Sequence, residues 1–129
     1  MDQEMSVDDK ELPPSALRRV RELSCTSTSR FKLGAIIFKG RRIVGKGINS
    51  KKTSPRFGSG QYLCLHAEGR ALYDCYKRGH DPRGCVILVH RTNDNCSRPC
   101  SDCQEMLLKH KIKKVYYFNE DRRLVCTWP

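Results

Sequence analysis

Cys100 and Cys103 follow Pro99 and form a C-x-x-C pair. At the start of a helix this spacing lets both sulfurs point at one metal ion, and the helix N-terminus stabilises the thiolate form. Two thiolates do not complete a zinc site, which takes four ligands. Structural sites fill all four positions with protein atoms, whereas catalytic sites leave one for water. The further donors therefore decide what chemistry such a site can do.

His66 is the strongest candidate for a third donor, and Glu68 lies two residues beyond it. A carboxylate close to the metal, without being a ligand, can take a proton from water that the metal has activated. Each fragment alone has an ordinary explanation. A histidine at a helix start is often a surface residue, a C-x-x-C can be a redox pair, and an acid in the first turn favours the helix dipole. Their combination favours a catalytic zinc site.

The other cysteines offer competing interpretations. The chain has eight cysteines, at positions 25, 64, 75, 85, 96, 100, 103 and 126. In a small secreted domain they would suggest disulfides, but the N-terminus lacks the pattern of a secretory signal. We therefore expect reduced thiols in the cytoplasm. Cys96 as a fourth ligand would make the site closed and structural, although three donors suffice for a catalytic one. A second, structural zinc using Cys25 or Cys64 stays open.

The segments around the motifs predict alternating helices and strands. In chain order we expect a helix from 13 with an apolar face over 16–23, strands over 33–38 and 43–48, a helix over about 65–78, a strand over 85–89, a helix over about 99–110, and strands over 114–118 and 124–127. Helices between strands imply parallel crossovers, and the short final turn implies an antiparallel edge strand. The prediction is one three-layer α/β/α domain over 13–129 with a mixed five-stranded sheet, preceded by a loose acidic tail over 1–12.

The net charge of the chain indicates which kinds of partner it would attract. The formal net charge is +11. Such a chain attracts nucleotides, DNA or RNA, unless the charge only solvates the surface. No apolar run approaches the roughly 18 residues of a membrane span, so we expect no membrane partner. The basic loop over 49–60 and its flank carry candidate phosphate contacts and candidate stacking residues, namely Lys51, Lys52, Arg56, Phe57 and Tyr62.

His66-Ala67-Glu68, Pro99-Cys100-x-x-Cys103 and the order of elements over residues 15–127 resemble the cytidine/deoxycytidylate deaminase superfamily. That superfamily also includes tRNA adenosine deaminases and the AID/APOBEC enzymes. The resemblance implies one catalytic zinc ion on His66, Cys100 and Cys103, with Glu68 carrying protons. It implies hydrolysis at C4 of cytosine, or C6 of adenine, with release of ammonia.

The resemblance also implies two substrate contacts. Asn49 matches an asparagine that contacts the sugar, although it could simply end its strand. Ala67 would offer its backbone to the pyrimidine, although it could simply be a small residue at a helix start.

Three functions remain to be separated. The first is deamination of a cytosine-containing nucleotide or nucleoside of the cytidine or dCMP type, which the closing hairpin favours. The second is deamination of single-stranded DNA or RNA. The histidine at position 66 favours this function over deamination of free cytidine, because many free-cytidine deaminases have a cysteine ligand at that position. The third is a non-catalytic zinc-stabilised binding module with four protein ligands. The loop over 92–98 is longer than in several relatives and could line the substrate site. Relatives often assemble, which leaves a homo-oligomer open.

Overall fold

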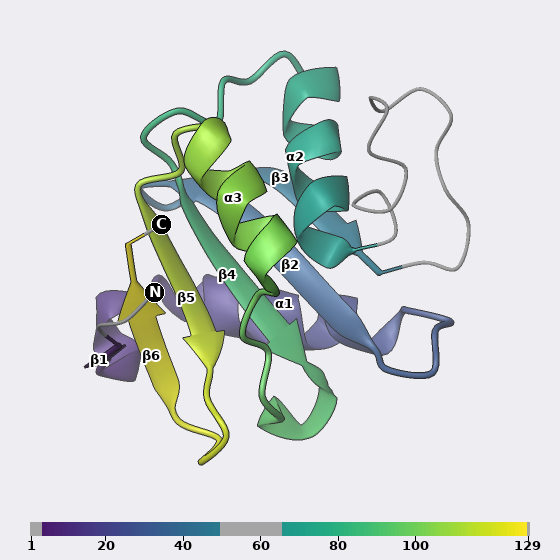
Figure 1. The fold of residues 1–129 in the computed structure, drawn as a ribbon, viewed down its shortest axis with the longest axis vertical. Helices are drawn as coiled ribbons and strands as arrows, with labels where there is room; N and C mark the ends of the chain where they lie inside the picture. The colour runs from purple at the N-terminus through teal and green to yellow at the C-terminus, as the bar shows by residue number, and fades with distance from the viewer. Residues whose placement is uncertain (1–3, 50–65, 129) are drawn as a thin grey trace.

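A six-stranded mixed sheet lies between two layers of helices in the computed structural model, which describes residues 4–49 and 66–128 (Figure 1). The elements are β1 Met5–Ser6, a 3-10 helix Asp9–Glu11, α1 Pro14–Cys25, β2 Leu33–Lys39, β3 Arg42–Ile48, α2 Ala67–Lys77, β4 Val86–Arg91, a 3-10 helix Thr92–Asp94, α3 Ser101–Lys109, β5 Lys114–Phe118 and β6 Leu124–Thr127. The strand order is β1-β6-β5-β4-β2-β3. The predicted three-layer α/β/α class is confirmed, with one strand more than expected.

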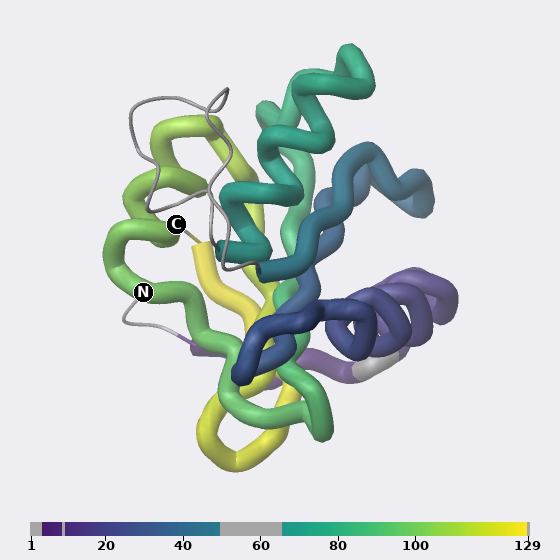
Figure 2. The backbone as a smooth tube through the Cα atoms, turned by 90° about the vertical axis from the view of Figure 1, so that its right-hand side faces the viewer, coloured from purple at the N-terminus to yellow at the C-terminus, as the bar shows by residue number. Residues whose placement is uncertain are grey.

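Both faces of the sheet are covered. α1 packs on one face, and α2 and α3 pack on the other (Figures 1 and 2). Val20 of α1 belongs to the same buried cluster as Leu88 of β4, whereas Ile87 and Val89 belong to the cluster beneath α2 and α3. Successive strand residues face opposite layers, so a strand covered on both sides reads as a continuous apolar run.

The strand directions bring two helix N-termini to one edge of the sheet. β3 and β4 both run antiparallel to β2, which lies between them, so they point the same way. β4 and β5 pair in parallel. α2 follows β3 and α3 follows β4, so both helices begin at the carboxyl edge of these strands, where ligands collect in α/β sheets. The expected parallel centre and antiparallel β6 are confirmed.

Two glycines let α2 lie directly on β3. A Cβ added to Gly47 would stand 2.5 Å from the backbone nitrogen of Ala71 and 2.7 Å from the carbonyl oxygen of Ala67. A Cβ added to Gly45 would stand 2.6 Å from the Ala71 carbonyl oxygen. These contacts are with backbone, which cannot move aside as a flexible side chain can. The glycines therefore set how closely α2 approaches the sheet, and Gly47 does so at its first turn.

Residues 4–12, expected as a loose tail, pack against the domain in the structure. Met5 and Ser6 of β1 pair antiparallel with Cys126 and Val125 of β6. Leu12 is 3% exposed and joins the cluster beneath α1. The reason is physical: the outer edge of β6 offers backbone hydrogen-bonding groups that a short extended segment satisfies. Acidic composition alone does not predict such pairing.

Among the described residues, no helix is both long and apolar enough to cross a membrane. Several predicted contacts lie outside the described part of the chain: Lys51, Lys52, Arg56, Phe57, Tyr62 and Cys64.

Candidate metal centre and active site

Three predicted metal ligands converge at the edge where α2 and α3 begin. One ligand atom from each of His66, Cys100 and Cys103 lies within 4.8 Å of the others. His66 Nδ1 is 3.1 Å from Cys103 Sγ and 3.8 Å from Cys100 Sγ. Tetrahedral zinc, with nitrogen at 2.0–2.1 Å and sulfur at 2.3 Å, places nitrogen and sulfur about 3.5 Å apart. The arrangement therefore fits a zinc ion.

The ends of the two helices place these side chains. His66 and Cys100 precede the first residues of α2 and α3 with extended backbone, and neither side chain caps its own helix. Cys103 lies in the first turn of α3. It is buried, His66 is half-buried and Cys100 is exposed. Solvent therefore reaches the cluster from the side of Cys100.

The electrostatics of the cluster also suit a cation. Burial raises the pKa of the Cys103 thiol, and negative charge on Glu68 and Cys100 raises it further. Burial lowers the pKa of His66, which favours the neutral imidazole that a metal requires. A divalent cation would stabilise the thiolates that their mutual repulsion disfavours. Two sulfurs and one imidazole nitrogen form a donor set that zinc prefers.

Glu68 lies beside the three donors without belonging to them. It is 4% exposed and hydrogen-bonds with Cys103. Burial raises the pKa of its carboxyl group, against hydrogen bonds from its own backbone and from Cys103 that act the other way. A carboxyl group with a raised pKa can hold and release a proton closer to neutral pH than an exposed one. Glu68 is therefore a buried acid next to the three donors, and its role as proton carrier stays a prediction.

Comparison with known proteins decides the family. The model of the cytidine and deoxycytidylate deaminase zinc-binding region matches residues 8–119. The chain belongs to this deaminase family. It is 30% identical over 111 residues to the deoxycytidylate deaminase of Mycobacterium phage D29, covering 70% of this chain and 80% of that protein.

Solved structures agree with this assignment. The dCMP deaminase of cyanophage S-TIM5 superposes with a TM-score of 0.63 and 29% identity, over 84% of this chain and 86% of that one. A diaminohydroxyphosphoribosylaminopyrimidine deaminase/5-amino-6-(5-phosphoribosylamino)uracil reductase from Thermotoga maritima shares the fold, with a TM-score of 0.55 and 23% identity. That match covers 78% of this chain but 27% of the longer protein.

The described part of this deaminase-family chain supplies three protein donors and no fourth. Its other histidines, cysteines and acids form no further cluster of metal ligands. Cys96 lies outside the cluster, with its sulfur 4.0 Å from Oε1 of Glu120. The described cysteines are free, so none of them forms a disulfide with another. An open metal position is what a catalytic site requires.

Asn49, the predicted sugar contact, directly follows β3 and holds a neighbouring segment. Its Oδ1 accepts hydrogen bonds from the Ser27 hydroxyl at 2.6 Å and from the Leu33 backbone at 3.0 Å. Its Nδ2 donates to the carbonyl oxygen of Phe31. Ala67, the predicted pyrimidine contact, is the first residue of α2 and is buried beside the metal cluster. Asn49 thus directly follows β3 and Ala67 begins α2 next to His66, and their roles in substrate binding stay predictions.

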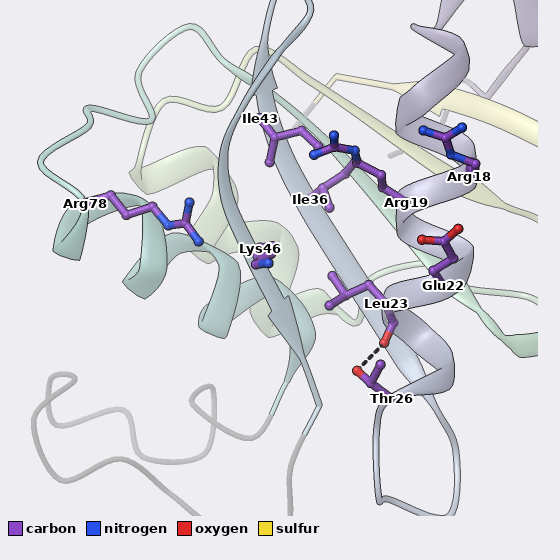
Figure 3. A pocket seen from close by; sticks show the side chains of 9 residues that line it. All are labelled: Arg18, Arg19, Glu22, Leu23, Thr26, Ile36, Ile43, Lys46 and Arg78. Carbon is purple, nitrogen blue, oxygen red and sulfur yellow. Dashed lines mark hydrogen bonds between the residues drawn. The ribbon is translucent and has the colours of Figure 1, made fainter.

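A groove on the described surface is separate from the metal cluster. It measures about 630 Å³ and lies between α1 and β3, where Figure 3 shows Arg19 reaching from α1 toward Ile43. Its lining combines cationic side chains with apolar ones: Arg18, Arg19, Glu22, Leu23, Thr26, Ile36, Ile43, Lys46 and Arg78. None of the three metal donors lines it, so it does not define the active site of this family member.

Ser97 and Arg98 belong to the loop over 92–98 that the sequence analysis named, but neither was predicted individually. They immediately precede Pro99 and make hydrogen bonds to distant segments. No local spacing or periodicity marks either residue, because Phe118 and Glu4, which they contact, lie at least 21 residues away in the sequence.

Proposed function

We propose that this chain is a zinc-dependent deaminase that converts cytosine to uracil in a free nucleotide or nucleoside, with dCMP as the first candidate. The observation that carries the proposal is the cluster of His66, Cys100 and Cys103 beside the buried carboxyl group of Glu68. The substrate class is supported by the phage D29 and cyanophage relatives, both called deoxycytidylate or dCMP deaminases. The cyanophage enzyme also has a structure in complex with dCMP and dUMP.

When bound, zinc would polarise water and lower its pKa toward neutrality. Glu68 would take the proton that the attacking water loses at C4 and deliver it to N3 of the ring. It would then help to protonate the departing amino group, so that water and cytosine become uracil and ammonia. The raised pKa of the buried carboxyl group suits both halves of this transfer.

Asn49 and Ala67 are proposed to position the substrate. Both acceptor positions of Asn49 Oδ1 and one N–H of Nδ2 are already engaged. A sugar hydroxyl would therefore accept a hydrogen bond from the second N–H of Nδ2. The backbone of Ala67, next to His66, would hold the edge of the pyrimidine.

The two alternative functions, a non-catalytic zinc module and a polynucleotide deaminase, require different structural features. A non-catalytic zinc module needs a fourth protein ligand, and it gives a buried carboxyl group beside the cluster no role. A polynucleotide deaminase needs a path for the strand, which the cationic groove could provide. Substrate selection in solution separates the second alternative from the proposal.

The test is a substrate panel. The full zinc-loaded chain is incubated with dCMP, cytidine, adenosine, single-stranded DNA and single-stranded RNA, and ammonia and base conversion are measured. We expect turnover of dCMP or cytidine that competing oligonucleotide does not suppress. Turnover confined to oligonucleotides, or to adenosine, would contradict the proposal.

Glu68→Gln keeps the size of the side chain and removes its acid. We expect this variant to retain zinc and to lose about 10²- to 10⁴-fold in turnover, the usual contribution of a positioned acid–base group. Glu105→Gln, at an exposed position on α3, is the matched control and should retain full turnover. Full activity in Glu68→Gln would overturn the role given to Glu68.

We also propose that the protein works in the cytoplasm. The described cysteines are free, and a reducing compartment keeps thiols in that state. Metal binding by Cys100 and Cys103 requires the same condition.

A further inference from the structure

The segment that carries Cys100 leaves the sheet where two parallel strands separate. β4 and β5 pair through residues 86–88 and 114–116. Beyond that point the chain leaves β4, forms the loop over 92–99 and enters α3 at Ser101. The position of Cys100 therefore depends on what holds this loop against the ends of β4 and β5.

Ser97 joins the two strands where their own pairing has ended. Its backbone N–H donates to the carbonyl oxygen of Phe118 in β5 at 2.8 Å. Its hydroxyl accepts from the backbone N–H of Phe118 at 2.9 Å and donates to the carbonyl oxygen of Val89 in β4 at 2.8 Å. Ser97 is 2% exposed, so these bonds are shielded from water. The residue takes the place of a strand residue between β4 and β5.

Arg98, the residue after Ser97, is held by ion pairs at the protein surface. Its guanidinium group pairs with Glu4 and with Glu120, the latter at 3.3 Å. It also lies 5.7 Å from the ring centroid of Tyr117, whose hydroxyl donates to Glu4. Two consecutive residues are thus anchored immediately before Pro99 and Cys100.

We propose that Ser97 is a positioning residue of the metal centre, which places Cys100 at the distance from His66 that one zinc ion requires. Pro99 is the only residue between the Ser97–Arg98 anchor and Cys100. A displacement of Ser97 and Arg98 would therefore displace the sulfur of Cys100 as well. The inference rests on the metal centre of the proposed function and extends it to a residue that touches neither metal nor substrate.

A purely structural role is the competing explanation, and Ser24 provides the comparison. Ser24 is also fully buried, and its hydroxyl lies 2.9 Å from the Arg21 carbonyl oxygen and 2.8 Å from Nδ1 of His90. It stands on α1, on the opposite face of the sheet from α2 and α3. Loss of either hydroxyl leaves buried polar groups without a partner. Only the loss of the Ser97 hydroxyl should displace a metal ligand and lower the zinc affinity.

The experiment measures zinc affinity by competition with a chromogenic chelator, without substrate, for the full chain and its variants. We expect Ser97→Ala to weaken zinc binding about tenfold, the lower end of the effect seen when groups that orient metal ligands are removed. Ser97→Thr, which keeps the hydroxyl, should retain most of the affinity. Ser24→Ala should keep the wild-type affinity even if it is equally destabilised toward urea.

Wild-type zinc affinity in Ser97→Ala, or an equal loss in Ser24→Ala, would overturn the proposal. If Ser97→Ala does not fold, Arg98→Gln takes its place and should also weaken zinc binding. Its control is Arg78→Gln, which breaks a comparably exposed ion pair with Asp74 at the far end of α2. Unchanged affinity in Arg98→Gln would likewise contradict the inference. Because no substrate is involved, the result is independent of whether the enzyme deaminates dCMP.

Discussion

His66 and His90 both stand near the carboxyl edge of the sheet, yet their surroundings give them different properties. His66 faces two thiols, whereas His90 at the end of β4 faces α1. Nδ1 of His90 lies 2.8 Å from the Ser24 hydroxyl, and Nε2 lies 2.6 Å from Oδ1 of Asp94. Burial lowers the pKa of His90, and this outweighs the opposite influence of Asp94. His90 therefore has a structural role in which its protonation is costly.

This cost predicts a pH dependence of stability. The pKa of His90 is lower in the folded protein than its value near 6.5 in the unfolded chain, so the unfolded chain binds more protons as the pH falls below about 6.5. The free energy of unfolding therefore keeps the contribution of neutral His90 above about pH 6.5 and loses it as the pH falls below that value. His90→Gln should lose less free energy of unfolding than wild type between pH 7.5 and 5.5. The difference in slope can reach at most about 1.4 kcal/mol per pH unit for one proton.

Urea unfolding at several pH values measures both slopes. Burial also lowers the pKa values of His66 and His110, but these residues are present in both proteins and cancel in the comparison. Identical slopes for wild type and His90→Gln would contradict the assignment.

At the scale of single residues, the sequence predicted what short spacing encodes. H-x-E and P-C-x-x-C each place two functional groups on one helix start, so local geometry already brings them together. The partners of Ser97 and His90 come from other elements, and His90 meets Ser24 across 66 positions of sequence. Such contacts leave no pattern that can be recognised before the fold is known.

At the scale of elements, the contact between β3 and α2 sets the position of His66, the metal ligand that precedes α2. Ala67, whose carbonyl oxygen lies against Gly47, directly follows His66. A side chain on Gly47 would have to push the first turn of α2 away from the sheet. That displacement would move His66 relative to Cys103.

Gly47→Ala should therefore lower both stability and zinc affinity. We expect a loss of about 1–3 kcal/mol in the free energy of unfolding, the usual cost of overpacking, together with weaker zinc binding. Gly40→Ala is the matched control, because an added Cβ there meets nothing within 4 Å but the backbone has a φ of +62°. It should cost about 1 kcal/mol through strain and leave zinc affinity unchanged. Undiminished zinc affinity in Gly47→Ala would show that α2 can shift without disturbing the centre.

The elements themselves were largely predictable, for a physical reason. Helices with an apolar stripe and strands buried on both faces carry patterns that arise from their own periodicity. β1 has only two residues and exists because β6 offers an open edge, so residues 4–12 read as a tail in isolation. The segment from Ser27 to the start of β2 at Leu33 is likewise held by Asn49, the residue after β3, a contact that the turn-forming character of asparagine does not reveal.

At the scale of the whole molecule, the sheet order assembles a centre from two distant segments. Strand β2 separates β3 from β4, yet the common direction of β3 and β4 aligns the starts of α2 and α3. Cationic side chains line the groove of Figure 3, whereas the metal centre gathers two thiols and lies beside a buried carboxyl group. The fold brings His66, Cys100 and Cys103 together at the starts of α2 and α3, inside the region that the family model matches.

Zinc K-edge X-ray absorption on the purified full chain tests the central claim most directly, because it counts the donor atoms around the metal. We predict one zinc per chain with two sulfur donors at about 2.3 Å and the remaining donors nitrogen or oxygen at about 2.0–2.1 Å. Cys103→Ser should remove one of the two sulfurs. Three or four sulfur donors in the wild-type protein, or a Cys103→Ser spectrum identical to it, would contradict an open centre built from His66, Cys100 and Cys103.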